Sequence, residues 1–122
     1  MLSLTCEEPS CKERKTVNVG ALLNLLADKK VLVSDGAWGT MLQDRGLAPG
    51  QCPEEWNVSH AEDVKSVAAE YAHAGSDLIL TNTFGGSATK LAKMGCGDRV
   101  RELNLAGARN SLQGAPGVLV AG

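Results

Sequence analysis

The chain has 122 residues, a formal net charge of −2, and 43% hydrophobic and 21% charged residues. This length suits one small domain, and the composition is that of an ordinary globular protein. The charge gives no basic field for nucleic acid or an anionic membrane, and no apolar run approaches the roughly 20 residues that span a bilayer. The N-terminus also lacks the basic start and apolar stretch of a secretory signal. We therefore expect a cytoplasmic protein without nucleic-acid or membrane partners.

The first third of the chain changes character twice. Residues 1–17 are polar and aperiodic, which predicts a mobile leader with no function of its own. Apolar residues then recur at helical spacing, so an amphipathic helix is predicted over residues 18–28. Residues 31–34 form a short apolar run that predicts a first, buried strand. Residues 18–122 are therefore expected to form the structured domain.

The middle of the chain carries the signals of two helices. Residues 40–45 are predicted to be a short helix that ends at Gly46. Ser59 followed three residues later by Glu62 matches a capping box, which predicts a second helix running to about residue 74. Gly75 is expected to end it.

Two more strand and helix pairs are expected after this point. Residues 77–82 are nearly all apolar, as expected of a strand buried on both faces. A short helix is predicted over residues 87–94, and Asp98 is expected to cap a longer one over residues 99–113. Residues 118–121 form a third apolar run that predicts a strand.

The alternation of helix and strand predicts an α/β fold with parallel strands joined by right-handed crossovers. A final strand without a charged edge is expected to await a further strand, so the chain is predicted to be part of a longer protein. Three βα units would be well under half of a (β/α)₈ barrel, which needs about 250 residues.

Most catalytic and metal-binding motifs are absent from the sequence. There is no phosphate-binding loop, no strand-linked dinucleotide fingerprint, no serine-nucleophile elbow and no zinc-protease motif. The four cysteines show no metal-ligand spacing, so we expect free thiols, with Cys52 in a Gly/Pro-flanked loop that leaves it room to be exposed. His60 and His73 are expected to be surface or packing residues. The four cysteines are Cys6, Cys11, Cys52 and Cys96.

Two clusters of polar residues follow the first two predicted strands. Asp35 lies at the tip of the first, where a carboxylate is costly unless it is paired or wet. It is expected either to hold a ligand amino group or to cap the helix that follows, and Gly36 and Ala37 offer backbone N–H groups for a carboxylate. The second cluster consists of Thr81, Asn82, Thr83 and Phe84. These residues are expected either to fix their loop by hydrogen bonds or to line a pocket. Trp56 and Asn57 are expected to be either an anchor of their own loop or a lid over the site.

Four segments together resemble the homocysteine S-methyltransferase family. They are Asp-Gly-Ala-Trp-Gly-Thr-Met-Leu-Gln at 35–43, Cys-Pro-Glu-Glu-Trp-Asn at 52–57, residues 74–85, and Val-Leu-Val-Ala-Gly at 118–122. The resemblance covers residues 19–122 and is closest to the N-terminal homocysteine-binding module of the cobalamin-dependent members. Members that use S-methylmethionine, S-adenosylmethionine or betaine as methyl donor are the alternatives.

The resemblance implies a (β/α)₈ barrel that transfers a methyl group to the homocysteine thiol, giving methionine. A family zinc ion holds that thiol as the reactive thiolate, and its three cysteine ligands are expected beyond Gly122. Cobalamin and methyltetrahydrofolate are implied for the cobalamin-dependent type, with their own binding modules and later barrel residues as partners. The family's second acidic residue for the amino group, on a later strand, has no counterpart here.

The family's substrate-binding positions carry over onto seven residues of this sequence. In the family these positions contact the amino-acid end of homocysteine or line the same pocket. They are Asp35, Gly36, Ala37, Thr81, Asn82, Thr83 and Phe84. No catalytic residue and no metal ligand is predicted within the chain, so the isolated chain is expected to be inactive. A non-catalytic α/β fragment or binding module remains the alternative.

Overall fold

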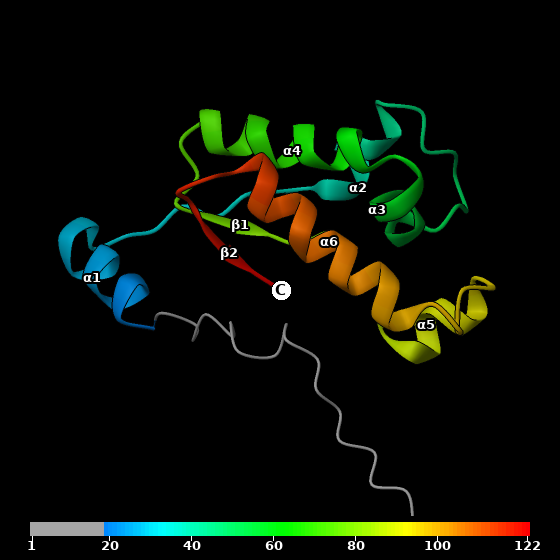
Figure 1. Cartoon of the computed structure of the whole chain (residues 1–122). Helices are drawn as coiled ribbons and strands as arrows, with labels where there is room; N and C mark the ends of the chain where they lie inside the picture. The colour runs from blue at the N-terminus through cyan, green and yellow to red at the C-terminus, as the bar shows by residue number, and fades with distance from the viewer. Residues whose placement is uncertain (1–18) are drawn as a thin grey trace, which may run out of the picture. The chain divides into compact units, whose positions relative to one another are not determined.

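The computed structural model describes residues 19–122. The described residues fall into two units that are treated separately, residues 19–30 and Val31–Gly122 (Figure 1). The first contains helix α1 (Val19–Lys29), at the place the apolar spacing predicts. The expected leader, residues 1–17, lies outside the described residues.

The second unit contains the other helices and both strands. Its elements in chain order are α2 (Trp38–Gln43), the 3₁₀ turn η2 (Pro53–Glu55), α3 (Trp56–Ser59), α4 (Ala61–His73), β1 (Leu78–Leu80), α5 (Ala88–Lys93), α6 (Val100–Gly114) and β2 (Leu119–Ala121). The order of helices and strands agrees with an α/β chain from α4 onward.

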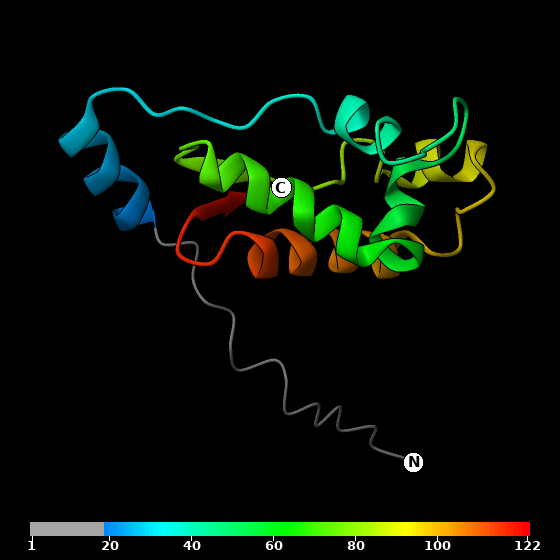
Figure 2. The ribbon, with the colours of Figure 1, turned by 90° about the horizontal axis from the view of Figure 1, so that it is seen from above.

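The two strands pair in parallel, with Leu78 opposite Leu119 and Leu80 opposite Ala121. Helices α4 and α6 lie side by side along them, as Figures 1 and 2 both show. Helix α4 also contacts β1, and α6 contacts β2. The predicted parallel α/β arrangement is therefore confirmed, although the described residues show only two paired strands and not a barrel.

The predicted first strand, residues 31–34, is wrong as a strand. Only Ser34 forms a bridge, which is parallel and pairs with Leu78. The backbone N–H of Val33 donates to the Asp77 carboxylate at 3.1 Å, so a side chain takes the donor that a regular ladder would use. Val31 is 72% exposed, so little burial holds this segment in an extended sheet.

The second predicted strand is shorter and less buried than its apolar sequence suggests. Of the expected residues 77–82, only Leu78–Leu80 are in β1. Ile79 is fully buried but Leu80 is 42% exposed, so the expectation of burial on both faces is wrong. The third strand, expected over residues 118–121, is β2.

The N-caps predicted for α4 and α6 are wrong, whereas α5, for which no N-cap residue was predicted, has a side-chain cap. The N-cap of α4 is His60, because Ser59 belongs to α3 and its hydroxyl donates to the Glu55 carbonyl at 3.1 Å. The N-cap of α6 is Arg99 and not Asp98, and no side-chain cap bond is made there. At α5 the Ser87 hydroxyl accepts from the Lys90 N–H.

The short helix expected over residues 40–45 begins earlier, at Trp38, and ends at Gln43. Gly46 and Gly75, which follow the ends of α2 and α4, adopt positive φ angles of 108° and 100°. This left-handed conformation is the one that favours glycine after a helix.

Three clusters of buried side chains form the core. One joins α2, α3 and α4, one lies between α4, β1 and the end of α6, and one joins the α5 region to α6. Their buried members are Leu42, Leu47, Trp56, Val64 and Val67; Ala68, Ile79 and Ala115; and Cys52, Leu91, Cys96 and Leu103.

The close approach of α4 and α6 depends on Gly114, the last residue of α6. A Cβ at this position would overlap the Lys65 carbonyl oxygen of α4 and would lie 3.0 Å from the Ala68 Cβ. We expect Gly114→Ala to lower the free energy of unfolding by about 1–3 kcal/mol, because the backbone of α4 must move.

Urea denaturation of Gly114→Ala beside Gly39→Ala measures this effect. Gly39 lies in α2, where an added Cβ meets no atom within 4 Å, so alanine there should be neutral or should stabilise by about 0.5–1 kcal/mol. Equal stabilities of the two variants would show that α4 and α6 are not tightly packed at Gly114.

Candidate functional site

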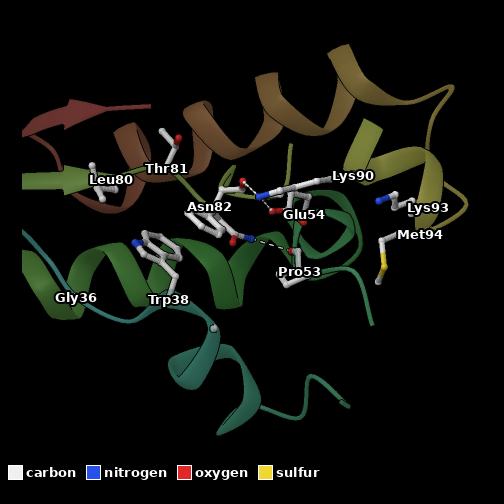
Figure 3. Close-up of a pocket in the computed structure, with 13 residues that line it drawn as sticks. Gly36, Trp38, Pro53, Glu54, Leu80, Thr81, Asn82, Lys90, Lys93 and Met94 are labelled. Carbon is white, nitrogen blue, oxygen red and sulfur yellow. Dashed lines mark hydrogen bonds between the residues drawn. The ribbon is translucent and has the colours of Figure 1, made fainter. Parts of the chain in front are cut away.

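A half-open cavity of about 640 Å³ lies beside the carboxyl end of β1 (Figure 3). Its walls come from Gly36 and the first turn of α2, from the loop at η2, from the end of β1 and the residues that follow it, and from α5 with the residue after it. The lining residues are Gly36, Trp38, Gly39, Pro53, Glu54, Leu80, Thr81, Asn82, Phe84, Gly85, Lys90, Lys93 and Met94. The carboxyl ends of parallel strands are where α/β folds place their ligands.

Asn82 follows β1 and holds the cavity wall to the loop at η2. Its side-chain N–H₂ donates to the Pro53 carbonyl and to the Asn57 carboxamide oxygen, both at 2.8 Å. The Asn57 amide donates in return to the Asn82 carbonyl at 2.8 Å and to the Leu103 carbonyl at 3.0 Å. Both asparagines are buried, so this network fixes the loop, the strand end and α6 to one another.

Trp56 and Asn57 are anchors of the loop. Both are buried, at 6% and 1% exposure, and Trp56 packs in the core against Leu42 and Val64. Of the two alternatives that the sequence left open, the structure therefore favours the anchor over the lid.

Asp35 binds three donors of its own chain. One carboxylate oxygen accepts from the Trp38 indole N–H at 2.6 Å and from the Leu80 backbone N–H at 2.9 Å. The other accepts from the Ser34 hydroxyl at 3.0 Å. Asp35 does not cap α2, whose N-cap is Ala37 without a side-chain bond. It instead fixes the Trp38 ring, which lines the cavity, to the end of β1.

Glu54 is a buried carboxylate in the cavity wall. It accepts from the Gly85 backbone N–H and from the Cys52 thiol, the latter at 3.4 Å. A Cβ at Gly85 would lie 2.7 Å from a Glu54 oxygen, so glycine allows this approach without a shift of the carboxylate. The loop at η2 is thereby joined to the loop after β1 by a second connection.

The far end of the cavity is cationic and apolar. The Lys90 ammonium donates to the Phe84 carbonyl at 3.3 Å and lies 4.3 Å from the centroid of the Phe84 ring. Phe84 is itself 93% exposed. Lys93 and Met94 complete this end, on the side of the cavity away from Leu80 and Trp38 (Figure 3).

The structure brings four of the seven predicted substrate-binding residues to the cavity. These are Gly36, Thr81, Asn82 and Phe84. Asp35 and Ala37 flank Gly36 without lining the cavity. Thr83 turns to a separate hollow beside β2, with its hydroxyl 2.6 Å from that of Thr81.

Sequence reasoning missed most of the cavity wall. All the missed residues that precede α5 belong to segments that resemble the family, which was a signal for them, whereas nothing in the spacing pointed to Lys90, Lys93 and Met94. The missed residues are Trp38, Gly39, Pro53, Glu54, Leu80, Gly85, Lys90, Lys93 and Met94.

Cys52 is buried, so the expectation that its loop leaves it exposed is wrong. Burial raises the pKa of this thiol, and the neighbouring Glu54 carboxylate raises it further, while backbone N–H groups oppose the shift. The unfolded chain therefore loses this proton at lower pH than the folded chain does. The raised pKa of Cys52 therefore contributes fully to the free energy of unfolding at neutral pH. This contribution declines as the pH rises above the ordinary thiol pKa of about 8.5.

We expect the stability of the wild-type chain to fall more steeply between pH 7.5 and 9.5 than that of Cys52→Ala. Denaturant unfolding at both pH values gives the change in the free energy of unfolding for each protein. The contributions of the titrating groups that the two proteins share cancel when the two changes are subtracted. Parallel declines in the two proteins would contradict the raised pKa.

The described residues do not provide a zinc site. Within residues 19–122 no three His, Cys, Asp or Glu side chains come together as a metal-ligand set. Cys52 and Cys96 are free, buried thiols. Cys6 and Cys11 lie outside the described residues. None of the helices among residues 19–122 has the length and apolar character needed to cross a bilayer.

Comparison with known proteins places this geometry in a family. The profile of the homocysteine S-methyltransferase family matches residues 32–122, which include the whole cavity wall. The chain belongs to the homocysteine S-methyltransferase family.

Two methionine synthases are similar to this family member. The protein of Mycobacterium leprae (strain TN) is 37% identical over 94 residues, and that of Mycobacterium tuberculosis (strain ATCC 25618 / H37Rv) is 34% identical over 92 residues. Each match covers 70% of this chain but only 8% of the relative. The chain thus spans a small part of the length of the relatives it matches.

Proposed function

We propose that this chain forms part of the homocysteine-binding domain of a homocysteine S-methyltransferase of the methionine synthase type. The observation that carries the proposal is the cavity beside the carboxyl end of β1, which lies wholly within the segment that matches the family. In this proposal residues 18–122 are part of a cytoplasmic (β/α)₈ barrel and residues 1–17 are a leader. The similarity to two methionine synthases supports this type over the other donor classes.

In the proposed complex, the amino-acid end of homocysteine lies at the β1 end of the cavity. Asp35 lies beside this end without lining the cavity. In the proposal its negative charge attracts the substrate ammonium, and the oxygen that accepts only from Ser34 keeps a lone pair for it. Gly36, Thr81 and Asn82 line the adjoining wall, with Phe84 further along it. Ala37 and Thr83 support this wall through the backbone of α2 and the hydroxyl of Thr81.

The role of the described residues is to bind and orient the substrate. Methyl transfer requires the homocysteine thiolate, which a metal ion can generate. As the family resemblance implies, this proposal places the zinc ligands outside residues 19–122 and cobalamin and methyltetrahydrofolate in other modules. Residues 19–122 contain no set of three His, Cys, Asp or Glu side chains that could hold a metal ion.

Titration of the ¹⁵N-labelled 122-residue chain with homocysteine tests the substrate assignment. We expect the amide signals of Gly36, Thr81 and Asn82 to shift in a saturable manner. Alanine, which has the same ammonium and carboxylate without the thiol-bearing chain, should bind about tenfold or more weakly. Shifts confined to residues outside the cavity, or no shifts with homocysteine, would overturn the proposal.

We further propose that the 122-residue chain alone does not methylate homocysteine. An assay of the purified chain with methylcobalamin, zinc and homocysteine measures this. Methionine formation with stoichiometric zinc bound would refute the division of labour proposed here.

A further inference from the structure

Tyr71 of α4 lies against Gly36, a residue of the cavity wall. A Cβ at Gly36 would lie 3.3 Å from the Tyr71 hydroxyl oxygen and 3.8 Å from its Cε1. Tyr71 does not itself line the cavity, whereas Gly36 does. The ring therefore occupies the space into which a side chain at Gly36 would extend, and it supports the wall from α4.

The same hydroxyl reaches the residue that follows Gly36. The Tyr71 O–H donates to the Ala37 carbonyl at 3.4 Å. This bond is long for an O–H donor, so it adds little to the free energy of unfolding. Its effect is local, because it restricts the carbonyl of the residue next to Gly36.

The Tyr71 ring is held firmly enough to act as a support. It is half-buried and packs against two core clusters, one that contains Val67 and one that contains Ile79. Trp38, which lines the cavity two residues after Gly36, packs against the same two clusters. A ring that is fixed in this way transmits the position of α4 to the wall.

The turn formed by residues 35–38 is also attached to β1. The Asp35 carboxylate accepts from the Leu80 N–H at 2.9 Å and from the Trp38 indole at 2.6 Å. Gly36 does not have a positive φ, so its backbone conformation does not demand glycine. The close approach of Tyr71 is therefore the feature that disfavours a side chain at this position.

We propose that Tyr71 is a positioning residue for homocysteine, because it sets the place of Gly36 and Ala37 at the β1 end of the cavity. This inference rests on the proposed function, in which the amino-acid end of the substrate lies there. Tyr71 does not contact the substrate and acts through the backbone of the turn. Small displacements of groups that orient a ligand are expected to weaken its binding.

A double-mutant cycle between Gly36→Ala and Tyr71→Phe tests this role, with homocysteine affinity of the 122-residue chain measured by calorimetric titration. Gly36→Ala should weaken binding about fivefold or more, because the new methyl group presses on the Tyr71 hydroxyl. Tyr71→Phe should weaken it about two- to fivefold through loss of the bond to Ala37. The double variant should bind within about twofold of Tyr71→Phe alone, because the nearest ring carbon is then 3.8 Å from the new Cβ.

Ser66→Ala is the matched control for loss of a hydroxyl from α4. The Ser66 hydroxyl donates to the Asp63 carbonyl at 2.9 Å and accepts from Arg45 at 3.2 Å, so it serves the packing of the helix and not the turn. Its removal should leave homocysteine affinity within about twofold of wild type. A merely structural role of Tyr71 would likewise lower the free energy of unfolding without changing this affinity.

The outcomes separate the inference from the proposed function. Recovery of affinity when Tyr71→Phe is added to Gly36→Ala supports the positioning role, and losses that simply multiply overturn it. Wild-type affinity of Gly36→Ala or of Tyr71→Phe also overturns it, and Tyr71→Phe alone decides if Gly36→Ala does not fold. In each of these cases wild type still binds homocysteine. Failure of homocysteine to shift the wild-type amide signals of Gly36 and Thr81 rejects the proposed function itself.

Discussion

Replacing Asn57 by alanine is expected to lower the free energy of unfolding by about 2–4 kcal/mol. The carboxamide makes three buried hydrogen bonds, two as donor to the carbonyls of Asn82 and Leu103 and one as acceptor from the Asn82 amide. Alanine leaves buried partners unpaired, and each such group costs about 1–3 kcal/mol. Part of the loss is recovered because the Asn82 amide keeps its bond to Pro53.

Denaturant unfolding of Asn57→Ala beside Asn24→Ala isolates this network from the effect of the substitution itself. Asn24 is exposed on α1, where alanine is the better helix former, so its replacement should cost nothing or stabilise slightly. A loss of less than about 1 kcal/mol at Asn57 would show that water replaces the broken bonds and that the loop is not fixed by them.

Replacing Asp35 by asparagine is expected to weaken homocysteine binding about tenfold or more. The substitution keeps the shape of the side chain but removes the charge that is proposed to attract the substrate ammonium. It also leaves only one acceptor oxygen for the indole of Trp38, the N–H of Leu80 and the hydroxyl of Ser34. We therefore also expect a loss of about 1–2 kcal/mol in the free energy of unfolding.

Calorimetric titration with homocysteine measures the first effect, and denaturant unfolding measures the second. Asp44→Asn is the matched control, since Asp44 is exposed after α2 and its replacement changes the net charge equally. If Asp35→Asn loses stability but binds homocysteine as tightly as wild type does, Asp35 only shapes the cavity wall.

Local sequence patterns predicted the helices and strands from α4 onward well. Helical spacing identifies α4 and α6, and the apolar runs identify β1 and β2. The helix starts were less predictable because capping is a competition between neighbours. Ser59 matches a capping box, yet its hydroxyl donates to the carbonyl of Glu55, the last residue of η2. The apolar run at 31–34 looked like a strand, but side chains of Asp77 and Asp35 hold it where a full ladder is absent.

The candidate site was predictable only where its residues follow a strand. The rule that ligands lie at the carboxyl ends of parallel strands brought Gly36 and Thr81 to one cavity. Glu54 and Lys93 could not be placed in this way, because a loop and a helix carry them. Only the folded chain shows that the loop at η2 is tied to Asn82 and Gly85.

The attachment of residues 31–35 to β1 has a consequence for ligand affinity. One bridge at Ser34 and a few bonds through Asp35 and Asp77 hold this segment, and it leads directly into Gly36 and Trp38 of the cavity wall. Such a thinly paired segment is expected to open on its own, well below the free energy of global unfolding. Whatever fraction of molecules is open at a given moment has no complete binding site. The measured dissociation constant is then the intrinsic one divided by the closed fraction. A substitution that strengthens the attachment of residues 31–35 to β1 therefore tightens binding without contacting the ligand.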